Sequence, residues 1–251
     1  MIKNKDYSGF KNNIKASITL LAFIAAFGFI SSCTPEEVAD SKDVNQAKIH
    51  QAYWVSYDAG ENNYYNIEAQ FRFGGANGTT LSLSEPSTVT VNKQEMKENL
   101  DTFRGCYYKT KLQNITDCIF TFKDTENKEY INKCLIQKVE LKPIKQIETD
   151  ANYEIEWIGM PVSQKEEVFV VIEDQENNTV IVSTTIVGSE TVKLKSKDMP
   201  DLIEGKGQIH VYRTWDSSLQ QAADDGGKIY SEYKSKKQSI DIVTNKEITK
   251  L

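Results

Sequence analysis

The sequence predicts an all-β protein whose folded part consists of two tandem antiparallel β-sandwiches. Apolar and polar residues alternate over short stretches, as in YNIEAQFRF at 65–73 and CIFTFK at 118–123, and a period of two marks a strand with one buried face. Turn-rich segments such as GGANG at 74–78 separate these stretches, which is typical of antiparallel sandwiches and barrels. Helical periodicity is weak and is confined to 93–100 and 217–224.

The first 32 residues have the organisation of a secretory signal peptide. Four Lys residues precede an almost entirely apolar stretch at 16–30, ASITLLAFIAAFGFI. This stretch is short for a membrane-spanning helix, which needs roughly 20 residues. We therefore expect residues 1–32 to be a leader that is removed before the mature chain folds.

The leader ends in Ile30-Ser31-Ser32-Cys33, which resembles the lipobox of bacterial lipoproteins. The resemblance implies that the Cys33 thiol carries a diacylglyceryl group and that Cys33 becomes the first residue of the mature chain. Several acyl chains, such as palmitate, hold a protein on a membrane stably. We expect a location in the cell envelope with a lipid anchor in the outer membrane, on either its surface or its periplasmic face.

Residues 33–46 are predicted to form an acidic, disordered tether. The stretch TPEE at 34–37 is similar to the acidic tags of surface lipoproteins of Bacteroidota, although its acids lie further from Cys33 and a Pro intervenes. The alternative is a plain polar tether that cannot bury itself. The leader's four Lys and one Asp contribute +3, so its removal changes the formal net charge from −6 to −9. An acidic chain without a basic stripe is not expected to bind nucleic acid.

A weak internal repeat has an offset of about 103 residues. TVTVNKQEM at 88–96 aligns with TVKLKSKDM at 191–199, and Trp54 aligns with Trp157. These collinear matches indicate a duplication, and chance similarity among strands is the alternative. We expect the two tryptophans to be equivalent core residues.

The repeat predicts two domains, residues 47–142 and 143–251. Each has about 100 residues and several short strands and resembles an immunoglobulin-like sandwich, although the antibody-type Cys pair is missing. The whole chain resembles two-domain lipoproteins of Bacteroidota. The resemblance is carried by the stretches 81–96 and 120–132 and by 209–233, and it implies no particular site.

Three cysteines remain after Cys33. Cys118 and Cys134 lie symmetrically about the turn of a predicted hairpin, so a symmetric register makes them face each other and permits a disulfide. That register also puts the polar Asn132 opposite Phe120, whereas a shift by one residue separates the thiols. A bridge to Cys106 and three reduced, buried thiols are the alternatives.

The sequence contains no catalytic or metal-binding motif. It has two histidines, His50 and His210, and neither lies in a zinc-binding or nucleophile-activating pattern. Acidic pairs such as Asp174 with Glu176 lie in predicted turns, where Asp is favoured for backbone reasons. We expect no cofactor, no metal and no enzymatic activity.

The candidate partner contacts lie near the long loop of the second domain. Trp215 precedes DSSLQQAADDGG, which contains Asp224 and Asp225, and end loops of sandwiches commonly carry binding residues. We expect a lipid-anchored, non-enzymatic module that binds or assembles with an envelope protein. The alternative is an accessory lipoprotein that captures glycans at the cell surface, with Trp215 in contact with sugar.

Overall fold

The computed structural model describes residues 36–61 and 63–244, so the leader and Cys33 lie outside the described residues. The first half contains strands β1 (Val38–Asp40), β2 (Ile49–Asp58), β3 (Tyr65–Phe73), β4 (Thr79–Ser82), β5 (Thr88–Val91), β6 (Gln94–Glu95), β7 (Lys97–Asp101), β8 (Gly105–Leu112), β9 (Cys118–Lys123) and β10 (Glu129–Cys134). The second half contains β11 (Val139–Leu141), β12 (Gln146–Glu148), β13 (Tyr153–Gly159), β14 (Glu166–Asp174), β15 (Thr179–Thr184), β16 (Thr191–Leu194), β17 (Gly205–Ser218), β18 (Gly227–Lys234) and β19 (Gln238–Val243). Short 3-10 turns occupy Ser41–Asp43, Gln46–Lys48 and Ser196–Asp198.

The all-β prediction is confirmed, and the weak helical patterns are wrong. Residues 93–100 form β6 and most of β7, because Asn92 and Lys93 both have positive φ, 47° and 66°, and turn the chain tightly between β5 and β6. Two consecutive residues with positive φ are typical of a two-residue hairpin turn. Residues 217–224 end β17 and continue into a turn.

The first half packs two sheets around an aromatic core. One sheet has the order β10-β9-β5-β6, and the other contains β2, β3, β4, β7 and β8. Tyr53 stacks on Phe120 with ring centroids 4.4 Å apart, and Phe71 lies 4.4 Å from Phe122. Because all four rings are fully buried, they form the centre of the first core.

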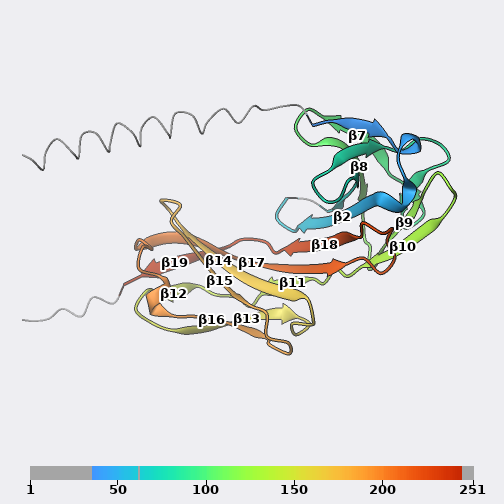
Figure 1. Ribbon diagram of the computed structural model, residues 1–251. Coiled ribbons are helices and arrows are strands. Elements are labelled where there is room, and N and C mark those ends of the chain that lie inside the picture. The colour runs from blue at the N-terminus through green and yellow to red at the C-terminus, as the bar shows by residue number, and fades with distance from the viewer. Residues whose placement is uncertain (1–35, 62, 245–251) are drawn as a thin grey trace, which may run out of the picture. The chain divides into compact units, whose positions relative to one another are not determined.

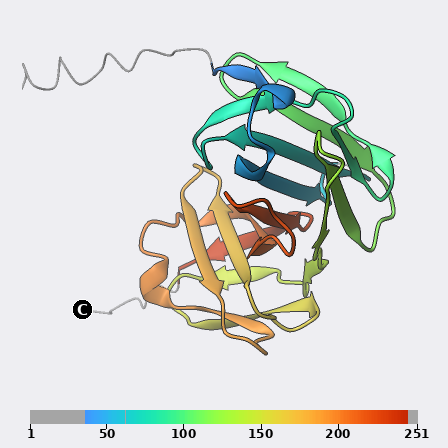
Figure 2. The same ribbon diagram turned by 45° about the vertical axis from the view of Figure 1, so that its right-hand side comes forward.

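The second half has the strand arrangement of an immunoglobulin-like sandwich. One sheet has the order β11-β13-β16, and the other places β15, β14, β17 and β19 side by side, with β12 parallel to β19. Figure 2 shows β14 and β15 as a long gold hairpin. The core between the two sheets includes Trp157, Val170, Leu194 and Ile209.

One sheet continues through both halves of the chain. The second part of β17 pairs with β18, and β18 pairs in parallel with β2 of the first half; Figure 1 shows the blue β2 beside the red β18. β17 is 14 residues long, so it reaches beyond its own sandwich. The result is a twelve-stranded sheet that includes strands of both halves.

The division between the two cores departs from the predicted domains 47–142 and 143–251. Val139 and Leu141 belong to the second core, because β11 pairs with β13. Ala223 and Ile229 belong to the first core, because β18 pairs with β2. The chain therefore leaves the first core before Val139 and returns to it in the second part of β17, where Trp215 packs against that core.

The part of the predicted tether from Val38 to Gln46 is folded rather than disordered. β1 pairs in parallel with β4, and Ser41 is fully buried. The amide of Gln46 donates hydrogen bonds to the carbonyls of Ser41 (2.6 Å) and Val44 (2.9 Å). These bonds satisfy polar groups that would otherwise keep the segment in water.

Trp54 is not the core residue that the repeat predicts. Its neighbours Tyr53 and Val55 are fully buried, so the alternation of β2 points Trp54 outward with 37% of its surface exposed, whereas Trp157 is 4% exposed. The repeat does hold at other positions, since Met96 and Met199 are both buried. β2 and β13 nevertheless pair with different strands.

Candidate functional site

Six residues lie in one row across the outer face of the twelve-stranded sheet. The register pairs Asp216 with Tyr230, Tyr230 with Trp54, Trp54 with Glu68, Glu68 with Lys109, and Lys109 with Lys97. Directly paired residues on neighbouring strands point to the same side of a sheet. We call these six residues the cross-strand row. At 4.7–4.9 Å between neighbouring strands, it is about 24 Å long.

An aromatic hollow of about 320 Å³ lies at the Trp54 part of the row. Trp54 and Tyr230 line it together with His50, Arg72 and Lys228. Nδ1 of His50 has no hydrogen-bond partner among the described residues. Burial lowers the pKa of His50, and the positive charges of Arg72 and Lys228 lower it further against the opposing negative charge of Asp225. The hollow therefore combines an exposed aromatic ring with Lys228, the carboxylate of Asp216 and Arg72, whose guanidinium forms an ion pair with Glu36.

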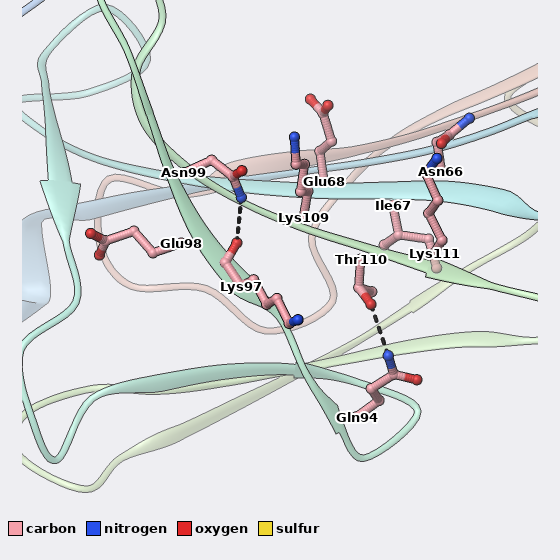
Figure 3. Close-up of a pocket in the computed structure, with 10 residues that line it drawn as sticks. All are labelled: Asn66, Ile67, Glu68, Gln94, Lys97, Glu98, Asn99, Lys109, Thr110 and Lys111. Carbon is pink, nitrogen blue, oxygen red and sulfur yellow. Dashed lines mark hydrogen bonds between the residues drawn. The ribbon is translucent and has the colours of Figure 1, made fainter.

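A second hollow, of about 410 Å³, lies where the chain passes from β6 to β7. Figure 3 shows the side chains of Lys109 and Glu68 next to each other, whereas the side chain of Lys97 runs away from them. On its other side, the amide of Gln94 donates a 2.9 Å hydrogen bond to the hydroxyl of Thr110. These contacts hold β6 against β8 and shape the hollow.

The lysines of this second hollow have no carboxylate partner. Lys97 and Lys109 occupy paired positions on β7 and β8, although their side chains run in different directions (Figure 3). Neither they nor Lys111 form an ion pair with any residue in 36–61 or 63–244. Glu68, the carboxylate beside Lys109, instead forms an ion pair with Arg104. The arrangement leaves a local excess of positive charge on an acidic protein.

The predicted contact residues Trp215, Asp224 and Asp225 have other surroundings. Trp215 is half-buried and packs against the first core. Lys48 lies 3.9 Å from a carboxylate oxygen of Asp224 and 3.5 Å from one of Asp225. The loop that follows β17 is bound to β10 through Asn132. The role of these residues in partner binding stays a prediction.

Cys118 and Cys134 face each other as the symmetric register predicts. Both thiols are buried and free in this structure, as is that of Cys106 on β8. Burial raises the pKa of the Cys134 thiol to about 12, even though a hydrogen bond from Ser231 opposes the shift, and burial also raises the pKa of Cys118. Few thiolates are present at neutral pH, so we expect formation of a bridge to need an oxidising enzyme of the envelope.

The disulfide between Cys118 and Cys134 is testable by mass. We expect the exported protein, alkylated in denaturant without reductant, to carry label on Cys106 alone, and the bridge to contribute about 3 kcal/mol in the chain-entropy model. Peptide mapping would locate the label, with a Cys118→Ser variant as the control. Alkylation of all three thiols in exported protein would contradict the prediction.

The acidic turn residues stabilise hairpins. Asp174 accepts hydrogen bonds from the backbone N–H groups of Glu176, Asn178 and Ile203. Burial works against its charge, but these bonds and one from the Asn178 side chain outweigh it and lower the pKa of Asp174 to about 2. Asp124 has the same role before β10. Within the described ranges, no three metal-ligating side chains gather, and no helix has the length and apolarity to cross a membrane.

The fold and this face define the class: an all-β protein of immunoglobulin-like sandwiches with an open aromatic and cationic sheet face. No protein-family model matches the sequence, and no curated protein is similar to it in sequence. Among solved structures, a tetra-tandem repeat in the extending region of a large adhesion protein is similar over 77% of this chain and 49% of that chain (12% identity, TM-score 0.26). Dimeric latent PorU from Porphyromonas gingivalis is similar over 86% of this chain and 21% of that chain (10% identity, TM-score 0.27). The chain thus spans about half of the first protein and about a fifth of the second, and the likeness concerns sheet-rich architecture alone.

The sequence reasoning missed the cross-strand row but contained a signal for part of it. Tyr53 and Val55, on either side of Trp54, point to the buried face of the strand. Because side chains alternate between the two faces, Trp54 must point outward. No pattern in the sequence indicates that Lys97 pairs with Lys109, because this pairing depends on the register between β7 and β8.

Proposed function

We propose that this protein is a lipid-anchored, non-enzymatic binding module of the cell envelope. The observation that carries the proposal is the cross-strand row, whose side chains stand on hydrogen-bonded strands of one sheet. A site on paired strands holds its side chains more rigidly than a site on loops. The face is shallow and open, which suits the capture of an extended partner.

The anchor in the outer membrane follows from the leader and Cys33. Attachment at the first residue of the mature chain would leave only Thr34 and Pro35 before the compact unit that begins at Glu36. Capture of an envelope protein and capture of a surface glycan are the two roles open to such a module, and Trp54 favours the second.

The anchor is tested by metabolic labelling with an alkyne analogue of palmitate. We expect label on the wild-type protein in the membrane fraction, and no label on a Cys33→Ser variant. A Cys106→Ser variant, which keeps the leader intact, should be labelled like the wild type. Protease treatment of intact cells then separates a surface location from a periplasmic one. An unlabelled wild-type protein would refute the anchor.

A further inference from the structure

We infer that the cross-strand row binds a linear anionic glycan, with one sugar ring stacked on Trp54 and the acidic groups of neighbouring sugars at Lys97 and Lys109. This inference rests on the proposed function and names its ligand class. It places the sugar site on the sheet face, rather than at Trp215 as the sequence alone suggests.

The aromatic hollow provides the sugar-ring contact. A pyranose ring has an apolar C–H face and a rim of hydroxyl groups, and an exposed indole offers a rigid apolar surface to that face. Trp54 is the exposed tryptophan of the row. Lys228 can donate hydrogen bonds to the rim, and the carboxylate of Asp216 can accept them. A few polar groups around an apolar surface are typical of a binding site.

The second hollow, which Lys97, Lys109 and Lys111 line, is the reason to expect a ligand with negative charge. None of these three lysines forms an ion pair within the described residues. Glu68 forms an ion pair with Arg104, so its carboxylate is not available to neutralise the charge of Lys109. A carboxylate or sulfate group in the hollow would be attracted to these unpaired lysines, and the attraction would weaken as salt screens it.

The geometry of the row favours a linear polymer over a small molecule. Trp54 and Lys109 are two strands apart, about 10 Å, with Glu68 between them. A single sugar ring is therefore too small to contact both Trp54 and Lys109. Successive sugars of one chain lying across the strands would contact each in turn.

Affinity electrophoresis tests this inference with the chain from Glu36 onward, which is the compact unit that holds both cores. The gels contain polygalacturonate, alginate or hyaluronan, each a linear polymer of acidic sugars. We expect retardation by at least one of them. Binding should be at least tenfold weaker for Trp54→Ala and for the Lys97→Ala/Lys109→Ala double variant, and weaker at high salt.

Matched controls separate the site from general effects. Met160→Ala removes an apolar side chain that is 64% exposed, and Lys193→Ala removes an exposed lysine; both lie in the second half and should bind as the parent does. All variants should unfold at the same temperature as the parent. Polygalacturonate with its carboxyl groups reduced to hydroxymethyl groups keeps the backbone without the charge and should not retard the protein.

Three results would overturn the inference. The first is that none of the three polymers retards the protein, and the second is that the reduced polymer retards it equally. The third is a loss of binding in the lysine double variant but not in Trp54→Ala, because that result indicates charge attraction alone. A photo-reactive phenylalanine at position 54 then tests the underlying proposal in cells. A cross-link to an envelope protein without glycan retardation would overturn the glycan inference and leave the binding module standing, and the absence of both would overturn both.

Discussion

Replacing Arg213 by alanine is expected to lower the free energy of unfolding by about 3–5 kcal/mol. Arg213 on β17 and Glu166 on β14 are each 3% exposed, and Nε of Arg213 donates to Oε1 of Glu166 over 3.0 Å. The same guanidinium donates to the carbonyls of Met160 (2.6 Å) and Pro161 (2.9 Å). Its removal leaves a buried carboxylate and two carbonyls without their donor.

The pH dependence of this variant identifies the cause. Burial of Glu166 opposes its charge, but the bonds from Arg213 and Ser163 outweigh burial and hold the pKa of Glu166 below its usual value. The parent therefore gains stability from this pair above pH 4.5 and loses it as the pH falls through the lowered pKa. In Arg213→Ala, burial still opposes the charge and only the bonds from Ser163 remain to favour it, so the pKa of Glu166 rises relative to that of the parent. The difference between parent and variant should shrink as the pH falls from 7 to 4.

Urea unfolding at pH 7 and pH 4 measures both effects. A double variant, Arg213→Met with Glu166→Met, removes both charges and should recover most of the loss, because no charge is then left buried. Lys237→Ala breaks an exposed pair with Glu173 and should cost less than about 1 kcal/mol. An Arg213→Ala protein within 1 kcal/mol of the parent at pH 7 would refute this account.

Replacing Asn132 by alanine is expected to cost about 3 kcal/mol and to release the loop that follows β17. Asn132 is fully buried on β10 opposite Phe120. Its Oδ1 accepts from the backbone N–H groups of Gln220 (2.8 Å) and Gln221 (3.0 Å), and its Nδ2 donates to the carbonyl of Gln221 (2.9 Å). One amide side chain therefore satisfies three backbone groups of the loop.

Limited proteolysis and thermal unfolding measure the loss. We expect Asn132→Ala to be cut within residues 218–226, where the parent resists. Gln221→Ala removes a side-chain bond to the backbone of Ile131 at the surface and serves as the control, with a small effect on stability and no new cleavage. Unchanged cleavage in Asn132→Ala would show that the loop is held by other contacts, such as Ala223 in the first core.

The residue alternation of the sequence determined the strands and the faces of many of them. The stretches around Phe71, Phe120 and Ile155 are strands with those residues buried, as their period of two predicts. The sequence left the register of the β9–β10 hairpin open between the symmetric pairing and a shift by one residue, and the structure has the symmetric pairing. Alternation is a local property, so a single stretch of sequence is enough to predict a strand and the face that it buries.

Only the tertiary structure decided which strands become neighbours. The parallel pairing of β18 with β2 joins residues nearly 180 positions apart, and no local pattern specifies it. That pairing brings Trp54 and Tyr230 together in one hollow. In the same way, the register between β7 and β8 pairs Lys97 with Lys109. Asn132 shows the same dependence, because a polar residue at a core position is stable only where a distant loop supplies its hydrogen-bond partners. Long-range strand pairing, which depends on the packing of the whole chain, therefore assembled the candidate site.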